Sequence, residues 1–377
     1  MNIPSHLDTI VAIVRGEAPP WPDDADETAG HELMEEARRQ GLHVLVAGRL
    51  REPAFSSWPS DVRAAFDREL RSAAVVEEAC RAEIDRVLTA LANAGVSGLL
   101  FKGTPLAYTH YPAPWLRPRM DTDLLVAGPD RETAVRTLET LGYTRAPLVD
   151  GSLIMRQAEY VKVSPSGIEH TIDLHWRIGN PQPVADLLSF DELLRRAVPV
   201  PPLGSAARAL CPEHALLVAA VHHVAHHAAG PRLIWRYDIH LVASAMIADE
   251  LRSFARCAVE KRVARVCASE LNAARATFGT CLAVEPGVLD NIFAGADPDE
   301  PSARYLKSPG PRVGRLLVEL RLLPTWRARA QLLRQHLFPS PSYMRQVYRH
   351  THPILLPVLY AHRVLTGIWA WFKRPAA

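Results

Sequence analysis

Two stretches decide the fold, Val96-Ser-Gly-Leu-Leu-Phe-Lys-Gly-Thr104 and Arg119-Met-Asp-Thr-Asp-Leu-Leu-Val126. In the first, a short apolar run leads into Lys102, Gly103 and Thr104. In the second, two aspartates lead directly into a short apolar run. Apolar runs of this length, bounded by turn-forming or polar residues, are typical of buried strands. The sequence therefore predicts two strands of one sheet, each with polar residues at one end.

A third polar position is predicted on a hairpin further along the chain. The segments Tyr160 to Val163 and Ile168 to Trp176 flank a Ser164-Pro-Ser-Gly167 turn, as expected for two antiparallel strands. In the second strand, apolar residues stand on both sides of Asp173. Because alternate side chains of a strand point to opposite faces, Asp173 is predicted to face away from the apolar side.

Helical patterns surround this region. Apolar residues recur at helical spacing over residues 31–50, 61–94 and 206–279, and residues 129–141 indicate a crossover helix. These patterns predict an α+β fold, with a small mixed-sheet core flanked by helical segments. The predicted divisions are an N-terminal helical segment (1–95), a sheet-containing core (96–200), a helical domain (201–300) and a basic C-terminal helical tail (301–377).

Three aspartates have the spacing that a pair of divalent cations requires. Asp121 and Asp123 are two residues apart on a predicted strand, so both side chains point to one face. Enzymes that transfer phosphoryl or nucleotidyl groups hold their metal ions with two or three carboxylates on a rigid support. We therefore predict Asp121, Asp123 and Asp173 as ligands of Mg²⁺ or Mn²⁺. Asp173 would also receive the proton of an attacking hydroxyl.

The residues beside these aspartates suit the binding of a phosphate chain. Glycine after a strand permits a tight turn and a close approach of the backbone to phosphate. Lysine and arginine neutralise a triphosphate, arginine by bidentate contact. The residues predicted to contact the nucleotide are Lys102, Gly103, Thr104, Arg117, Arg119 and His175. Plain surface charge remains the alternative for both arginines, and a structural role in the interior remains the alternative for the histidine.

The order of these motifs resembles the polymerase-β-like nucleotidyltransferase superfamily, in which a strand and a Gly-Ser or Gly-Gly turn precede an acidic pair and a later lone carboxylate. The chain is more similar to the bacterial family called uncharacterised nucleotidyltransferase. Lys102-Gly103 resembles that family's phosphate loop, and Leu116 to Val126 resembles its metal strand. Asp173-Leu-His-Trp-Arg177 is similar to its third-carboxylate strand. The resemblance extends from about Glu32 to the segment Leu216–Leu241.

This resemblance implies transfer of a nucleoside monophosphate from an NTP to a hydroxyl or similar acceptor, with release of pyrophosphate. Asp121 and Asp123 would bridge two Mg²⁺ ions, and Asp173 would hold the catalytic ion and orient or deprotonate the acceptor. Thr104 departs from the wider superfamily, and a longer gap before Asp121 implies an insertion carrying Tyr108 to Trp115. The acceptor (a small molecule, a peptide or an RNA) is left open.

Two other classes of protein fit parts of the pattern. A catalytically silent binding or adaptor protein would keep the same fold, although the three intact aspartates favour turnover. Nucleotide-sugar glycosyltransferases also bind metal through Asp-x-Asp, but they place a longer alternating strand–helix domain before that motif. Here mostly helix and a single apparent strand come before Asp121, which disfavours a glycosyltransferase.

Charge is unevenly distributed along the chain. Residues 301–377 contain 13 lysines and arginines and one acidic residue, Glu319, whereas the first 300 residues contain 30 basic and 40 acidic residues. A basic tail indicates an anionic partner. The candidates are an RNA acceptor, the acidic body itself, or an anionic lipid surface that the aromatic residues Trp369, Trp371 and Phe372 would also contact. Packing on the protein's own helices is the remaining alternative.

Cysteine usage and apolar runs predict the compartment. The five cysteines include no CxxC pair, which favours free thiols in a reducing cytoplasm. We expect no signal peptide, and no transmembrane helix, because the apolar segment Ile354 to Phe372 contains His362 and Arg363 near its middle. The prediction is a cytoplasmic protein, with peripheral membrane contact as a further option.

Four histidines, His222, His223, His226 and His227, form two i,i+4 pairs on a predicted helix. That spacing can hold one zinc ion, but neither an HExxH motif nor an obvious third ligand accompanies it. The alternative is that these side chains pack and hydrogen-bond, with Asp238 as a partner.

Overall fold

In the computed structural model, strands of the described residues form a seven-stranded mixed sheet in the order β3-β4-β5-β2-β1-β7-β6. The structure describes residues 5–146, 155–180, 182–226, 232–297, 299–306, 316–317, 319–321, 323–349 and 352–372. The strands are β1 (Gly98–Leu100), β2 (Thr122–Val126), β3 (Thr144–Arg145), β4 (Gln157–Val163), β5 (Glu169–His175), β6 (Val198–Pro199) and β7 (Arg208–Ala209). At the centre, β2 pairs antiparallel with β1 and parallel with β5, and β5 pairs antiparallel with β4.

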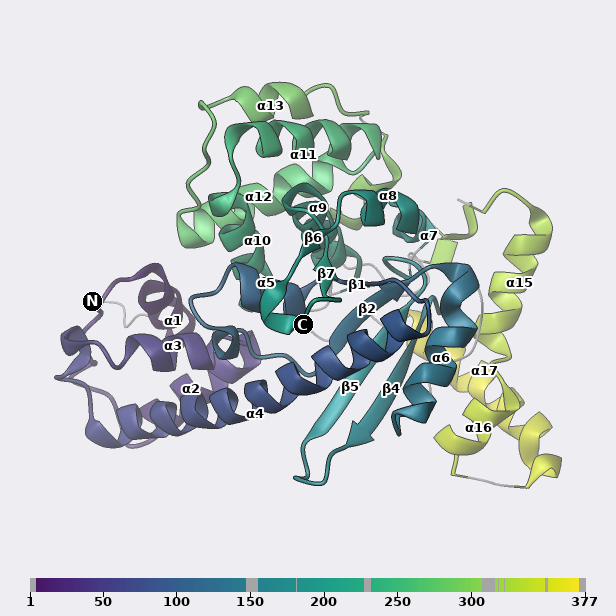
Figure 1. Ribbon diagram of the computed structural model, residues 1–377, viewed down its shortest axis with the longest axis horizontal. Helices are drawn as coiled ribbons and strands as arrows, with labels where there is room; N and C mark the ends of the chain where they lie inside the picture. Colours follow the sequence, from purple (N-terminus) through teal and green to yellow (C-terminus); the bar gives the residue numbers. More distant parts are fainter. Residues whose placement is uncertain are drawn as a thin grey trace.

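Helices surround this sheet, as Figure 1 shows. The helices that precede or interrupt the strands are α1 (His6–Arg15), α2 (Ala29–Gln40), α3 (His43–Arg49), α4 (Ser60–Asn93), α5 (Gly103–Thr109), α6 (Arg131–Thr140), α7 (Gln182–Ala185) and α8 (Phe190–Arg195). Those that follow are α9 (Pro212–His226), α10 (Leu233–Ala245), α11 (Ala248–Glu260), α12 (Ala264–Phe278), α13 (Val288–Phe293), α15 (Trp326–Leu337), α16 (Pro341–Val347) and α17 (Leu356–Phe372). The fold is α+β, as the sequence predicts.

The long helix α4 shows how the local sequence produces this arrangement. Its C-terminal half buries Ile84, Leu88 and Leu91 at helical spacing against the sheet. Its end is marked by Gly95, which adopts φ 76°, a left-handed conformation that glycine reaches at little cost. The prediction of one helix over residues 31–50 is wrong. The structure has two helices there, α2 and α3, which are separated where Gly41 adopts φ 74°.

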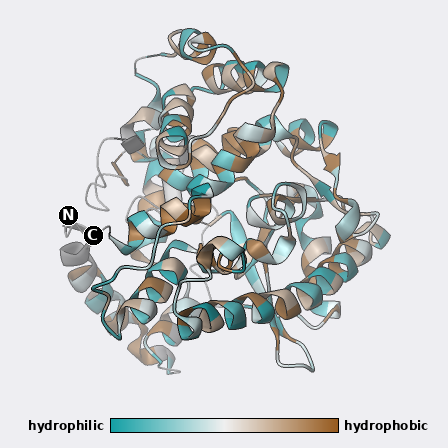
Figure 2. Cartoon of the chain, turned by 90° about the vertical axis from the view of Figure 1, so that its left-hand side faces the viewer, coloured by the Kyte–Doolittle hydropathy of each residue, from teal (hydrophilic) through white to brown (hydrophobic). Residues whose placement is uncertain are grey.

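The two faces of the sheet pack in different apolar clusters. On one face, Leu100 and Leu124 pack with side chains of α4 and α6. On the other, Phe101 and Leu125 pack with α9, α10, α11 and α12. A third cluster joins α1 to α4 with Ile234 at the start of α10. Figure 2 shows hydrophilic and hydrophobic residues along most helices, as helices with one buried face have. The predicted domain boundaries remain a prediction.

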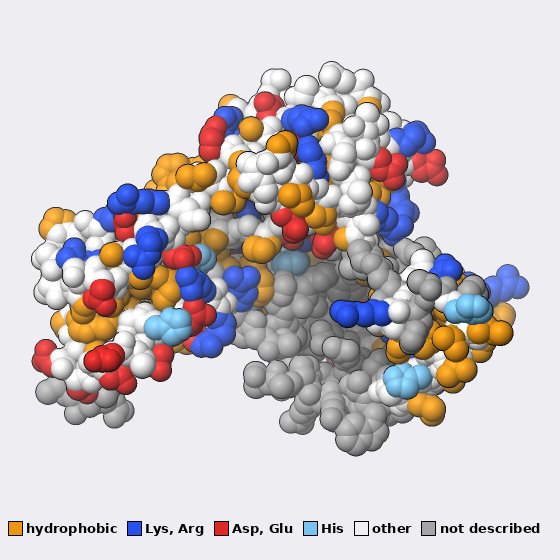
Figure 3. All heavy atoms as spheres, turned by 90° about the horizontal axis from the view of Figure 1, so that it is seen from below, with side chains coloured by type: hydrophobic (Ala, Val, Ile, Leu, Met, Phe, Trp, Pro, Cys, Tyr) orange, Lys and Arg blue, Asp and Glu red, His pale blue; other side chains and the backbone are white. Residues whose placement is uncertain are grey.

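The C-terminal segment from α15 to α17 carries several large apolar side chains at the surface, of which Trp326, Ile354 and Leu365 are more than 70% exposed. Figure 3 shows such side chains beside lysines and arginines on the right of the molecule. Within the described residues, no helix is long and apolar enough to span a bilayer. The side chains of Trp369, Trp371 and Phe372 lie outside the described part, so the role predicted for them stays a prediction, as does the cytoplasmic location.

Candidate active site

Strand alternation places the predicted carboxylates on one face of the sheet. Leu124 and Leu174 pack against α4 and α6, whereas Leu125 packs in the cluster that α9 to α12 form. Because successive side chains of a strand point to opposite faces, Asp123 and Asp173 point to the side of Leu125. The two carboxylates therefore lie on the face that the later helices cover.

Strand register then brings three polar side chains together. The parallel pairing of β2 and β5 places Asp123 directly opposite Asp173. His175 follows two residues later on β5, and its Nε2 lies 2.9 Å from Asp123 Oδ1 and 3.3 Å from Asp173 Oδ2. All three residues are buried, and one potential ligand atom of each lies within 4.8 Å of the others. We call Asp123, Asp173 and His175 the inner site.

Asp123 is held in its ionised form by two cationic or hydrogen-bonding neighbours. The Lys102 Nζ lies 2.6 Å from Asp123 Oδ1, the same oxygen that His175 contacts. Burial opposes the charge of Asp123, but the charge of Lys102 and the hydrogen bond from His175 outweigh burial and lower the pKa of Asp123 to about 2. The pKa of His175 is raised, because its hydrogen bonds to Asp123 and Asp173 outweigh its burial and the charge of Lys102.

Asp173 has one satisfied and one unsatisfied carboxylate oxygen. Its Oδ2 accepts a hydrogen bond from Gln157 Nε2, and Gln157 is itself held by Asn180, whose Nδ2 donates to Gln157 Oε1 at 3.1 Å. Its Oδ1 is buried and has no hydrogen-bond donor among the described residues. A buried carboxylate oxygen without a donor is costly, so the donor set of the inner site fits a divalent cation that would contact this oxygen.

Asp121 lies at the exposed rim of the same region, one residue before β2. Although it reaches solvent, the surrounding protein displaces part of its hydration. That burial and the negative charge of Asp123 raise the pKa of Asp121 to about 6, and Lys102 opposes the shift. Asp121 is thus a carboxylate whose ionised form is disfavoured by its neighbours. The structure brings Asp123, Asp173 and His175 together at the floor and places Asp121 beside them.

The predicted phosphate loop is the connection from β1 to α5. Lys102 adopts φ 59° and ψ −133°, a left-handed conformation that is uncommon for a residue with a side chain and is found preferentially at functional sites. Gly103 opens α5, and the hydroxyl of Thr104 is buried without a hydrogen-bond partner among the described residues. The backbone therefore turns sharply at the point where the Lys102 side chain reaches Asp123.

A side chain at Gly103 would be crowded. A Cβ at this position would lie 3.0 Å from Arg117 Nη2, and that guanidinium is fixed by Asp238. We expect Gly103→Ala to destabilise the protein by about 1–3 kcal/mol, as overpacking of a buried position does, and to weaken nucleotide binding. Urea unfolding measures the loss. Gly128→Ala, where a Cβ meets no atom within 4 Å, is the control and should change stability by less than about 0.5 kcal/mol.

The two predicted nucleotide-binding arginines are engaged elsewhere in this structure. Arg117 donates from Nε and Nη2 to the Asp238 carboxylate of α10 at 2.7–3.2 Å, and Tyr111 Oη donates to the same carboxylate at 2.7 Å. Arg119 forms a bidentate pair with Glu77 of α4 at 2.6 and 2.7 Å. All of these charged groups are buried or nearly so. Both arginines therefore link the core to flanking helices, and their contact with a nucleotide stays a prediction.

Sequence reasoning missed two groups of supporting contacts. Gln157 and Asn180 hold Asp173. The predicted hairpin could have indicated Gln157, because its turn fixes a strand register in which Gln157 lies opposite His175. Asp238 accepts hydrogen bonds from Arg117 and Tyr111 across more than a hundred residues of chain. From the sequence, Asp238 is expected only as a partner of the histidines, because local sequence patterns carry no signal for so distant a contact.

The histidine cluster is only partly described. His223 Nδ1 contacts Glu270 Oε2 of α12 within the interior, rather than Asp238, which bonds Arg117 and Tyr111. His227 and the side chain of His226 lie outside the described residues. Among the described residues, the inner site is the group of three that could hold a metal ion, so the zinc hypothesis for the cluster remains untested.

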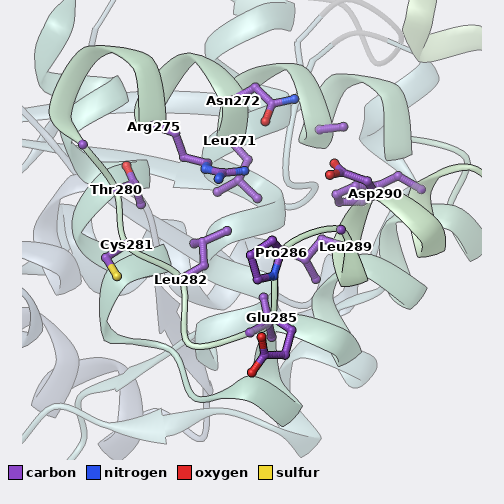
Figure 4. Close-up of a pocket in the computed structure, with 15 residues that line it drawn as sticks. Leu271, Asn272, Arg275, Thr280, Cys281, Leu282, Glu285, Pro286, Leu289 and Asp290 are labelled. Atoms are coloured by element: carbon purple, nitrogen blue, oxygen red, sulfur yellow. The ribbon is translucent and has the colours of Figure 1, made fainter.

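Two cavities differ in their relation to the carboxylates. One adjoins the phosphate loop: Lys102, Leu106 and other residues of α5 line it together with β7 and the first turn of α9, and its surface is largely apolar. The other lies between α12 and α13 and carries Arg275, Glu285 and Asp290 (Figure 4). None of the predicted site residues lines the second cavity, so the first is the one that can extend the site around Asp123.

The model of a family described as uncharacterised nucleotidyltransferase matches residues 26–279, which is more than half of the chain. No curated protein matches the chain. The matched range contains the inner site, Asp121, the phosphate loop and the helices α9 to α12 that cover them. The chain belongs to the uncharacterised nucleotidyltransferase family.

Proposed function

We propose that the protein transfers a nucleoside monophosphate from an NTP to a hydroxyl or similar group of an acceptor, using divalent cations held by Asp121, Asp123 and Asp173. Family membership supports a nucleotidyltransferase in general terms. The observation that carries the finer proposal is the in-register pair Asp123 and Asp173, buried side by side, with one Asp173 oxygen left without a donor. The same arrangement supports membership in the polymerase-β-like superfamily.

Each residue has a role that follows from its position. When bound, divalent cations neutralise the triphosphate and stabilise the charge that develops during transfer. Asp173, buried and held by Gln157, orients the acceptor hydroxyl and receives its proton. The acceptor oxygen forms a bond to the α-phosphorus, the bond from that phosphorus to the bridging oxygen breaks, and pyrophosphate leaves with the electron pair.

Lys102 is the cation that we assign to the triphosphate. Its Nζ already lies at the inner site, 2.6 Å from Asp123. Arg117 and Arg119 would first have to leave buried partners, Asp238 and Glu77, and breaking a buried ion pair is costly. The apolar cavity beside Lys102 offers a place for the base or for an apolar part of the acceptor.

Labelled nucleotides test this function directly. Full-length protein is incubated with Mg²⁺ or Mn²⁺, cell extract and each NTP labelled either at the α- or at the γ-phosphorus. We expect label from the α-position to appear on an acceptor and label from the γ-position to appear in pyrophosphate. Transfer of the γ-label to the acceptor would indicate a phosphotransferase instead. Binding of NTP without any transfer would favour the catalytically silent protein.

A further inference from the structure

The inner site combines two kinds of ligand atom, and this combination bears on which cation it accepts. Two members, Asp123 and Asp173, offer carboxylate oxygens, and the third, His175, offers an imidazole nitrogen. Mg²⁺ strongly prefers oxygen ligands and keeps several of its waters. First-row transition ions bind carboxylate oxygen and also accept imidazole nitrogen, with higher affinity for a given site of nitrogen and oxygen ligands.

The imidazole nitrogen lies close to carboxylate oxygens of both aspartates. His175 Nε2 lies 2.9 Å from Asp123 Oδ1 and 3.3 Å from Asp173 Oδ2. Neighbouring ligand atoms around a six-coordinate ion with bonds of about 2.1–2.3 Å are roughly 3 Å apart. The two distances from His175 Nε2 to the carboxylates thus match the spacing of neighbouring ligands on one ion, and one potential ligand atom of each of the three residues lies within 4.8 Å of the others.

The position of the ring is fixed by packing. His175 is 1% exposed, and its ring meets the Phe101 ring edge-to-face at a centroid distance of 4.8 Å. Its other nitrogen, Nδ1, is buried without a hydrogen-bond partner among the described residues. Nε2 contacts the two carboxylates, and in the described part of the chain no hydrogen bond at Nδ1 competes with that orientation.

An independent observation concerns the carboxylate of Asp173. Asp173 is 7% exposed, and its Oδ1 is buried without a donor. Gln157 satisfies only the other oxygen. An ion seated between Nε2 and the two carboxylates would contact a group that the protein alone leaves unsatisfied.

We propose that His175 Nε2 is a direct ligand of the inner cation, and that the inner site consequently prefers a first-row transition ion, with Mn²⁺ as the probe, over Mg²⁺. This inference rests on the proposed function, since both place a divalent cation between Asp123 and Asp173. It adds a ligand and a metal preference that the three-carboxylate scheme does not contain.

Electron paramagnetic resonance of Mn²⁺ tests the ligand without measuring activity. Metal-free full-length protein is titrated with Mn²⁺, and spin-echo modulation detects any nitrogen bonded to the ion. We expect an imidazole coupling in the wild-type protein and in His170→Asn, the matched control on the same strand but the opposite face of the sheet. In His175→Asn the coupling should disappear and the affinity for Mn²⁺ should fall at least about tenfold, whereas the affinity for Mg²⁺ should change less.

A second measurement needs no substitution and covers the case in which His175→Asn fails to fold. Wild-type protein with ¹⁵N-labelled histidine should change the modulation pattern, because only a directly bonded histidine nitrogen gives the strong coupling. Mn²⁺ binding without a histidine coupling, or a coupling that persists in a folded His175→Asn, would overturn the inference and leave the proposed function standing. Failure of both ions to bind would overturn the inference and also count against the proposed function.

Discussion

Asp121→Asn should abolish nucleotidyl transfer and, at the same time, make the metal-free protein more stable above pH 6. In the proposed function Asp121 holds catalytic cations, and loss of such a carboxylate removes several kcal/mol of transition-state stabilisation, so we expect a decrease of at least about 10³-fold in transfer rate. The stability effect has the opposite sign because the folded protein raises the pKa of Asp121 from its usual 3.8 to about 6. The charged form is thus disfavoured on folding.

The pH dependence follows from that shift. Below about pH 4 the carboxyl is protonated in the folded and the unfolded chain alike, and the variant and the wild type should differ little. As the pH rises through 6 the wild type loses stability relative to the variant, and above that the difference is constant. Melting temperatures of both proteins from pH 4 to 8, without metal, measure it. Asp130→Asn is the control, and full transfer activity in Asp121→Asn would refute the assigned role.

Arg117→Met should destabilise the protein by about 3–5 kcal/mol, the largest stability loss that we expect from a single substitution here. The reason is that Asp238 would be left as a buried carboxylate with only the Tyr111 hydroxyl as a partner, and removing one member of a buried ion pair leaves an uncompensated charge. Urea unfolding gives the free energy. The loss should also loosen the contact between α10 and the phosphate loop, because Arg117 packs against Gly103.

A double-mutant cycle separates the buried charge from lost packing. The pair Arg117→Met with Asp238→Leu should recover much of the stability, because it removes both charges and keeps apolar volume. Arg252→Ala, which breaks an exposed pair with Asp249, should cost less than about 1 kcal/mol. Simple additivity of the losses at 117 and 238 would contradict the interpretation of the pair as a coupled buried unit.

The elements that could be predicted from the sequence are those governed by local periodicity. The apolar flanks of Asp173 predict its direction because a strand has only two faces, and the structure places Leu174 under α4 accordingly. The same rule predicts that Asp123 and Asp173 share a face. Their adjacency then follows from the parallel pairing of β2 and β5, which the short apolar runs do not specify.

Contacts between distant segments could not be predicted in this way. Arg117 and Arg119 have the composition of a phosphate site, yet which anion they meet depends on how α10 and α4 dock, and nothing in their own neighbourhood encodes Asp238 or Glu77. The short strands β6 and β7 were missed for a related reason. Each has two residues, too few for an alternating pattern to be recognised.

The ion pair between Lys102 and Asp123 has a consequence for the order in which the protein acquires its ligands. The Lys102 side chain acts as a tethered counter-ion for Asp123. We therefore expect the chain to fold before it binds any metal. A cation that arrives must then displace the Lys102 ammonium group from Asp123. A triphosphate that arrives together with the cation offers this ammonium a new anionic partner. Metal and nucleotide should therefore strengthen each other's binding, and by the reciprocity of linked equilibria each should do so by the same factor.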